Sequence, residues 1–265
     1  MDDITITETI DVIKDIKEAI DNKRAFSLLR FCDGFLKIGN DIINDKQDVL
    51  TLQHRKEGIP MEFFDELMKR WVVDANEADY IDAPRHYLVD RIMSKRMYRT
   101  SSSLQELIRN WDKIYSHFGI DLDRKFCSPE AGYLSFMEGK ENLLDVIHGK
   151  NICCITNYYE VEKKLYPFVN SITVKLIPYF YGNHYEVSFD SIMNEIKEEI
   201  NKYDAWLVGA GELGRLYTGE IKRNGGVAVD IGKVFDAWAI EYIDSRMKDV
   251  LSISQDNKLL FCIKE

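Results

Sequence analysis

From residue 150 onward, short apolar runs alternate with longer stretches in which apolar residues recur every three or four positions. The apolar runs have the length of buried strands and lie at 151–156, 171–178, 205–210 and 226–232. The periodic stretches predict amphipathic helices over 159–168, 189–200 and 212–224. Strands that alternate with helices form parallel sheets covered on both faces, and we expect such a sheet here.

The first half of the chain shows the same kinds of element in a less regular order. Residues 5–21 predict an amphipathic helix, which Thr5 and Glu8 would begin as a capping box. The run at 25–31 predicts a buried strand that ends in a turn at Cys32-Asp33-Gly34. A short helix is expected at 61–71.

We therefore predict a single α/β domain over residues 1–265, built on a Rossmann-like, mostly parallel sheet flanked by helices. The charged and mostly helical segment at 82–140 would be an insertion in its N-terminal half. Such sheets bind ligands beyond the carboxyl ends of their strands, so the loops after these strands are the candidate sites.

Composition narrows the function classes. The 265 residues carry a formal net charge of −10, and an acidic chain lacks the basic face that nucleic-acid binding needs. The N-terminus has no basic region typical of a secretion signal, and no apolar run approaches the roughly 20 residues that cross a bilayer. The five cysteines include no Cys-x-x-Cys pair, which favours a reducing, cytoplasmic location over disulfides or a zinc site.

A glycine-rich loop follows the strand at 205–210. Gly209, Gly211 and Gly214 match G-x-G-x-x-G between a strand and a helix, with Glu212 inside the loop. Free N–H groups at the start of that helix would point at phosphate oxygens. Asp230 lies where a dinucleotide-binding protein holds ribose. The motif fits NAD(P), another phosphate ligand, or merely a tight turn with close packing.

Arg30 and Asp33 bracket the end of the first strand. An acid there would hold a divalent cation that bridges a diphosphate, and an arginine would bind phosphate through its forked N–H donors. An Asp-Gly turn with an arginine ion pair explains the same residues without a ligand.

Together and in this order, the two elements resemble the GT-D-type glycosyltransferases. That family has R-[FY]-G-D-G-E at a strand end near the N-terminus, where this chain has RFCDGF at 30–35. Near the C-terminus it has a strand, a glycine-rich loop, a helix and a strand ending in D-I-G. Here LVGAGELG at 207–214 is followed by GVAVDIG at 226–232. The resemblance is clear over 24–40 and 150–240.

The resemblance implies a Rossmann-like enzyme that takes a sugar from a nucleotide-sugar, usually UDP-linked, to an acceptor, here expected to be a glycan or glycoprotein. Donor binding is then expected at Arg30, Gly34, Gly209, Gly211, Glu212, Gly214, Asp230 and Gly232. Catalysis is expected at Asp33, Lys233 and Asp236.

The resemblance also ties an Asp-x-Glu pair to a metal ion and the donor diphosphate. Asp33 matches the aspartate, but Phe35 stands at the glutamate position and Cys32 at the first glycine. One carboxylate binds Mg²⁺ or Mn²⁺ poorly, and a phenyl ring offers no ligand. Two alternatives follow: either Asp33 helps to hold a metal ion at the diphosphate, or the enzyme works without a metal.

Without a metal, fixed positive charge would stabilise the leaving diphosphate, supplied by Arg30, Lys233 and Arg215. The other interpretation of Lys233 is a solvated surface lysine. Asp236 would either accept the acceptor's proton as a general base or cap the helix that follows.

Thr156 and Asn157 follow a strand core and would touch base or ribose, or cap the loop. His184, among aromatic residues, would stack on a base, bind phosphate, act as an acid or base, or simply pack. Two other functions fit the sequence. One is an NAD(P)-dependent oxidoreductase with its site at 209–230, and the other is a relative that binds nucleotide-sugar without transferring it.

Overall fold

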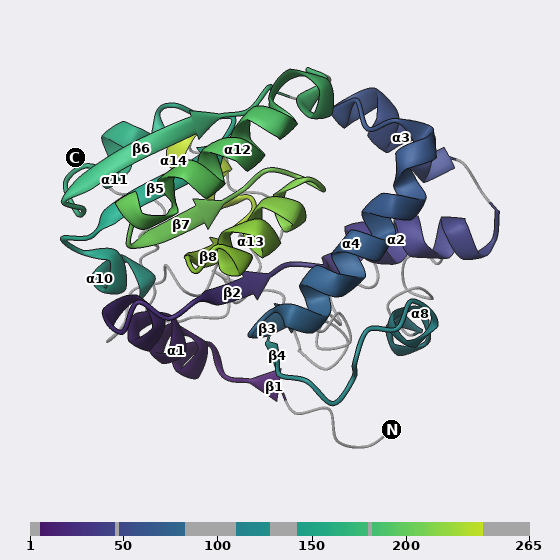
Figure 1. The fold of residues 1–265 in the computed structure, drawn as a ribbon, viewed down its shortest axis with the longest axis horizontal. Coiled ribbons are helices and arrows are strands. Elements are labelled where there is room, and N and C mark those ends of the chain that lie inside the picture. The colour runs from purple at the N-terminus through teal and green to yellow at the C-terminus, as the bar shows by residue number, and fades with distance from the viewer. Residues whose placement is uncertain (1–5, 46–47, 83–109, 128–141, 180–181, 241–265) are drawn as a thin grey trace.

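The computed structural model of the chain describes residues 6–45, 48–82, 110–127, 142–179 and 182–240. Within these ranges eight strands form one parallel sheet in the order β1-β4-β3-β2-β8-β7-β5-β6 (Figure 1). The strands are β1 (Ile6–Thr7), β2 (Phe26–Leu29), β3 (Tyr80–Asp82), β4 (Phe126–Cys127), β5 (Asn151–Thr156), β6 (Ser171–Leu176), β7 (Ala205–Val208) and β8 (Val227–Asp230). The predicted fold class, a parallel sheet flanked by helices, is confirmed.

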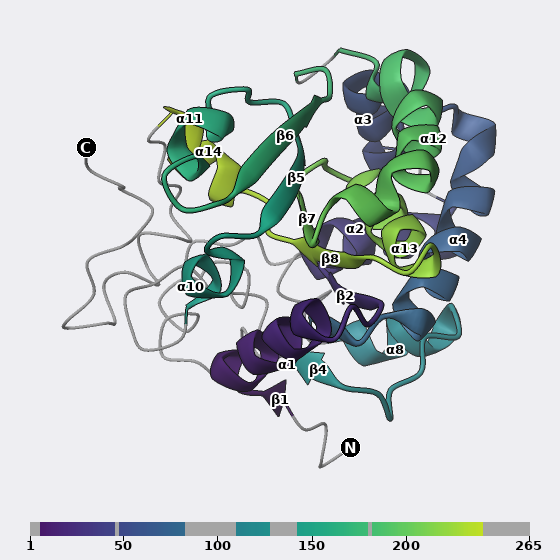
Figure 2. The same ribbon diagram turned by 60° about the vertical axis from the view of Figure 1, so that its left-hand side comes forward.

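Helices cover both faces of the sheet (Figure 2). The first face packs against α2 (Cys32–Ile43), α4 (Phe64–Glu77), α8 (Trp111–His117), α12 (Asp190–Glu199) and α13 (Gly214–Arg223). The second face packs against α1 (Thr9–Asp21), α10 (Leu143–Ile147), α11 (Val161–Leu165) and α14 (Val234–Ile240). Helix α3 (Asp48–Glu57) lies against α2. Short helical turns adjoin α4 and α12 at Met61–Phe63, Tyr185–Phe189 and Ile200–Lys202.

Strand β5 shows how one apolar run serves two cores. Cys153 and Ile155 pack on the first face, whereas Ile152 and Cys154 pack on the second. Successive side chains of a strand point to opposite faces, so a doubly covered sheet needs apolar residues at every position. Burial raises the pKa of both thiols, which keeps these cysteines neutral and suits them to packing.

The predicted strands form, but four of the five, β2, β6, β7 and β8, are up to three residues shorter than predicted. Strand β5 runs from Asn151 to Thr156 as predicted. Strand β7 ends at Val208, two residues early, because Gly209 already approaches the turn after β8.

The turn predicted at Cys32-Asp33-Gly34 is wrong, because these residues begin α2. Phe31, just before them, already has helical dihedral angles. The helix places Phe35 and Leu36 in the core, where both are fully buried. Burying a large apolar side chain stabilises the fold by about 1.5–3 kcal/mol, which outweighs the turn preference of Asp-Gly.

The segment predicted as a helical insertion, 82–140, also contributes to the sheet. It contains β4, which pairs with β1 and β3, as well as α8. Much of the remainder lies outside the described residues. The helix start predicted at Thr5 with a capping box is wrong, because Ile6–Thr7 form β1 and α1 begins at Thr9 after Glu8. None of the helices in the described part of the chain is both long and apolar enough to cross a membrane.

Candidate functional site

The candidate site lies at the carboxyl end of β8, where the helices that follow neighbouring strands pack on opposite faces of the sheet. After β2 and β7 the chain enters α2 and α13, which pack on the first face. After β8 it enters α14, which packs on the second face. Strand β8 lies between β2 and β7, so the chain diverges on both sides of it. Open α/β sheets bind ligands at such a divergence, and the candidate site is centred there.

The turn after β8 brings three predicted residues together. The Asp230 carboxylate accepts a hydrogen bond from the Gly232 N–H at 3.0 Å. Gly232 has φ +51°, and the Arg30 guanidinium occupies the space that a Cβ would need. Only glycine meets both demands without strain. The guanidinium from the end of β2 therefore lies directly against the turn that follows β8.

Two buried carboxylates lie at the ends of β3 and β8, the strands on either side of β2. Burial raises the pKa of Asp230 to about 6, the charges of Arg30 and Arg215 oppose that rise, and Asp82 adds to it. Asp82, the last residue of β3, accepts a hydrogen bond from the Phe31 N–H at 2.6 Å. Asp82 therefore holds the main chain after β2, Asp230 holds the main chain after β8, and the charges of both arginines act on Asp230.

The loop after β7 packs tightly against its surroundings. At Gly209, a Cβ would collide with the Phe235 ring and lie 2.7 Å from the Gly232 carbonyl oxygen. At Gly214, it would lie 3.3 Å from a methyl group of Val208. The tight-turn interpretation of these two glycines therefore agrees with the packing.

Gly211 in the same loop lies against an acidic side chain from α3. It has φ +59°, and a Cβ there would lie 2.6 Å from Glu57 Oε1. The Glu212 N–H donates a hydrogen bond to that oxygen at 3.2 Å. Desolvation raises the pKa of Glu57 to about 7, although a hydrogen bond from the Leu213 main chain and the nearby Arg215 and Lys56 oppose the rise. The amides predicted to hold phosphate thus hold a carboxylate of the chain itself.

Arg215 joins the glycine loop to the end of β2. Its Nε donates to the Arg30 carbonyl at 2.9 Å and its Nη2 to the Phe31 carbonyl at 3.0 Å. Its guanidinium pairs with Glu212 and stacks over the Trp71 ring, 4.7 Å from the centroid. Arg215 and Glu212 are both buried. The charges of Arg215 and Glu212 therefore stabilise the fold around the site.

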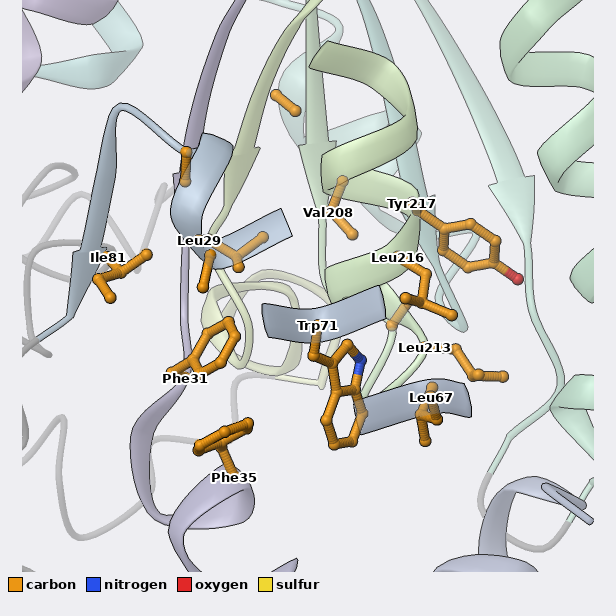
Figure 3. Packing of buried hydrophobic residues seen from close by; sticks show 14 of the residues in the cluster. Leu29, Phe31, Phe35, Leu67, Trp71, Ile81, Val208, Leu213, Leu216 and Tyr217 are labelled. Atoms are coloured by element: carbon orange, nitrogen blue, oxygen red, sulfur yellow. The ribbon is translucent and has the colours of Figure 1, made fainter. Parts of the chain in front are cut away.

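The Arg-Phe-Cys-Asp-Gly-Phe element is divided between site and core. Phe35, at the glutamate position of the family motif, is fully buried in an aromatic cluster and points into the core (Figure 3). Its ring lies 4.6 Å from Phe31 and 5.5 Å from Tyr115, between centroids. Gly34 lies beside Glu212, whose Oε1 would be 2.5 Å from a Cβ at position 34. Asp33 is in the first turn of α2, and its side chain lies outside the described residues.

A two-carboxylate metal site at positions 33 and 35 does not fit this arrangement. The side chain at position 35 is apolar and faces the core. Moreover, among the described residues no three or more His, Cys, Asp or Glu side chains are grouped so as to hold a metal ion. We therefore derive no step through a metal.

The remaining predicted residues fall into two groups. Lys233 and Asp236 lie in the turn after β8 and the first turn of α14, with Lys233 exposed. Thr156 and Asn157 lie at the end of β5, where the buried Thr156 hydroxyl accepts a hydrogen bond from the Tyr158 N–H at 3.4 Å. That bond is the loop cap that was one of the two expectations for Thr156.

His184 lies away from the turn after β8, on the face covered by α13. Its Nε2 is 2.9 Å from the Tyr217 hydroxyl, and the ring is buried. Burial lowers its pKa to about 4, so the imidazole is neutral near pH 7. The packing interpretation describes this environment, and a role in donor binding stays a prediction.

Sequence reasoning missed two residues of the site. Asp82 directly follows the apolar Tyr80 and Ile81, and an acid at a strand end is the signal that singled out Asp33, so Asp82 was open to detection. Glu57 carries no such signal, because it ends a helix and meets Glu212 across 155 positions of the chain.

A comparison with protein families shows to which family the chain belongs. The family described as a GT-D fold-like domain matches residues 7–238. The chain belongs to the GT-D-like family. The resemblance seen in the sequence is therefore confirmed, and the match spans both the Arg30 element and the turn after β8.

Solved structures support the GT-D-like fold. A selenomethionine-substituted structure of domain of unknown function 1792 has TM-score 0.54 and 14% identity, covering 86% of this chain and 78% of that chain. Another, described as that domain with a distinct glycosyltransferase fold, has TM-score 0.52 and 16% identity with the same coverages. A third, described as a new glycosyltransferase from Streptococcus sanguinis, has TM-score 0.50 and 14% identity, covering 86% and 81%. Such identities establish similarity of fold. A comparison with curated proteins found no match.

Proposed function

We propose that this GT-D-like chain is a cytoplasmic glycosyltransferase that moves a sugar from a nucleotide-sugar, with UDP as the expected nucleotide, to a glycan or glycoprotein. The observation that carries the proposal is the Arg30 guanidinium seated against Gly232 where the chain diverges around β8. The position is where an α/β sheet binds a ligand, and its positive charge suits a diphosphate.

The proposed reaction needs charge stabilisation at the leaving group. The bond between the sugar's anomeric carbon and the diphosphate oxygen breaks, and its electron pair leaves with the diphosphate. The acceptor's hydroxyl oxygen bonds to that carbon and loses its proton to a base, for which Asp236 is our candidate. Arg30 and Lys233, on two adjoining strand ends, would stabilise the negative charge of the leaving diphosphate.

Ligand-dependent stabilisation tests the donor class directly. We expect UDP or a UDP-sugar to raise the melting temperature, because a ligand at 100 times its dissociation constant adds about 2.7 kcal/mol to the unfolding free energy. GDP-sugars and NAD(P) serve as the comparison ligands. Stabilisation by NAD(P) alone would overturn the proposal. Stabilisation by a UDP-sugar without sugar transfer would indicate a protein that binds the nucleotide-sugar but is not a transferase.

A charge-removal variant tests the reaction itself. We expect Lys233→Ala to lower sugar transfer by roughly 10- to 100-fold, because one fixed charge facing a transition state is worth a few kcal/mol. Lys69→Ala, an exposed lysine on α4, is the control and should retain full activity. Activity should also survive a metal chelator. Full activity of Lys233→Ala, or complete loss with chelator, would contradict the role given to positive side chains.

A further inference from the structure

The start of α13 already binds an anion. The Glu57 carboxylate accepts the Glu212 N–H at 3.2 Å, and the Leu213 main chain stabilises the same carboxylate. These amides lie in the turn that leads directly into the ten-residue helix α13, and the helix dipole favours negative charge at this end. A phosphate at these amides would need the place that Glu57 holds.

Glycines on both sides of the contact, one in the glycine loop and one directly after Glu57, allow the carboxylate to lie in this position. Gly211 has a positive φ, and a side chain there would collide with Glu57. Gly58, directly after Glu57, also has a positive φ and packs against the main chain of Asn183. The contact between α3 and the glycine loop is therefore specified by the sequence at two positions.

The carboxylate is incompletely satisfied in this position. Glu57 Oε2 is buried and meets no hydrogen-bond donor within the described residues. The charged groups that face Glu57 are Lys56 of α3 and Arg215 of α13, and the latter already pairs with Glu212. Tyr217 of α13 is the nearby neutral hydroxyl. A buried carboxylate oxygen without a donor costs free energy, so Glu57 can be exchanged for a better-bound anion.

We infer that Glu57 is an internal competitor of the donor's phosphate at the amides of Glu212 and Leu213. This inference rests on the proposed function for its ligand class, a nucleoside diphosphate. The phosphate enters that position when the Glu57 carboxylate leaves it, while Arg30 at the end of β2 and Lys233 in the turn after β8 attract the diphosphate. The apparent affinity is then lowered by the fraction of molecules in which Glu57 occupies the loop.

Pyrophosphate binding measured by calorimetry tests the competition without a nucleotide or sugar. The proteins are the wild type, Glu57→Gln and the control Glu66→Gln, which removes an equal charge from an exposed position on α4. At pH 8 we expect Glu57→Gln to bind pyrophosphate about tenfold more tightly than the wild type, a change of about 1.4 kcal/mol. Glu66→Gln should stay within about twofold.

The ratio of the variant and wild-type dissociation constants should approach one at pH 6, where the wild-type carboxyl is also neutral. Because the probe's own protonation is the same for both proteins, it cancels in that ratio. An unchanged or weaker affinity in Glu57→Gln at pH 8, or an equal gain in Glu66→Gln, would overturn the inference.

A measurement on the wild type guards against a variant that does not fold. The ¹⁵N-resolved amide signals of Glu212 and Leu213 should shift when pyrophosphate is added, and signals that do not move at saturation would reject the inference. Failure of the proposed function looks different. Pyrophosphate would then behave as expected while no nucleotide-sugar binds to any of the proteins.

Discussion

The turn after β8 and the loop after β7 lie side by side, and each has a glycine with positive φ against a charged side chain. At Gly232 that side chain is Arg30, and at Gly211 it is Glu57. The same backbone feature, a glycine with positive φ, thus lies against a cation in the turn after β8 and against an anion in the loop after β7. The difference teaches that a glycine motif alone does not specify phosphate binding, because the neighbouring side chain decides which charge the loop accepts.

The largest expected effect comes from Arg215, which joins the glycine loop to the end of β2, the strand that Arg30 directly follows. Replacing Arg215 with methionine leaves the buried Glu212 without its ion pair and removes two donors from the carbonyls at the end of β2. We expect Arg215→Met to lower the unfolding free energy by about 3–5 kcal/mol, measured by urea denaturation.

The control is Arg24→Met, whose pair with Asp79 has an arginine side chain 45% exposed. Exposed pairs contribute about 0–1 kcal/mol, so this variant should unfold close to the wild type. Equal losses in the two variants would mean that Arg215 does not hold the glycine loop to the end of β2.

A smaller loss is expected from Gly232→Ala. The new methyl group would meet the Arg30 guanidinium, and the left-handed backbone alone costs about 1–2 kcal/mol for a non-glycine residue. The total should reach about 2–3 kcal/mol in urea denaturation. Gly149→Ala, with φ +69° and no atom within 4 Å of its Cβ, isolates the backbone cost. A loss at position 232 no greater than at position 149 would contradict the close seating of Arg30.

Gly211→Ala tests the acidic side of the comparison through a double-mutant cycle. Its methyl group would collide with Glu57, so combining it with Glu57→Ala should recover about 1 kcal/mol of the loss. The same Glu57→Ala change should recover nothing from Gly232→Ala. Simple additivity at positions 211 and 57 would show that the carboxylate does not occupy the loop in solution.

The smallest effect is a change in pH dependence. A carboxyl group whose folded-state pKa is raised, as at Glu57, makes the folded protein less stable as pH rises from its unfolded pKa toward about 7. Glu57→Gln should therefore gain stability relative to the wild type across that window, on the order of 1 kcal/mol by pH 8. Asp230 and Asp74, raised to about 6, act in the same direction in both proteins and cancel in the difference. Urea denaturation at several pH values measures the difference, and a constant offset would contradict the assignment.

The sequence carried enough local signal to predict the sheet and the residues at its central strand ends. The run at 151–156 became β5 with the same bounds, and Arg30, Asp230 and Gly232 meet as the strand-end argument requires. Parallel topology explains this success, because it brings the carboxyl ends of separate strands to one edge.

Contacts between distant segments explain what could not be predicted. Asp33-Gly34 has the local chemistry of a turn, but burial of Phe35 in an aromatic cluster draws it into a helix. The two-residue strands β1 and β4 pair with each other and are too short to leave a periodic pattern. The glycine loop matched a phosphate motif, whereas its actual neighbour comes from a helix end far away in the sequence.

The contact of Gly209 with Phe235 and the Gly232 carbonyl has a mechanical consequence. Where Gly209 faces the Gly232 carbonyl, main chain lies against main chain, and no side chain at that point can absorb a displacement by changing rotamer. Movement of one loop must then be transmitted to the other, so that they behave as one rigid ledge above β8. A ligand that contacts either loop would therefore bind to a surface whose shape depends on both loops.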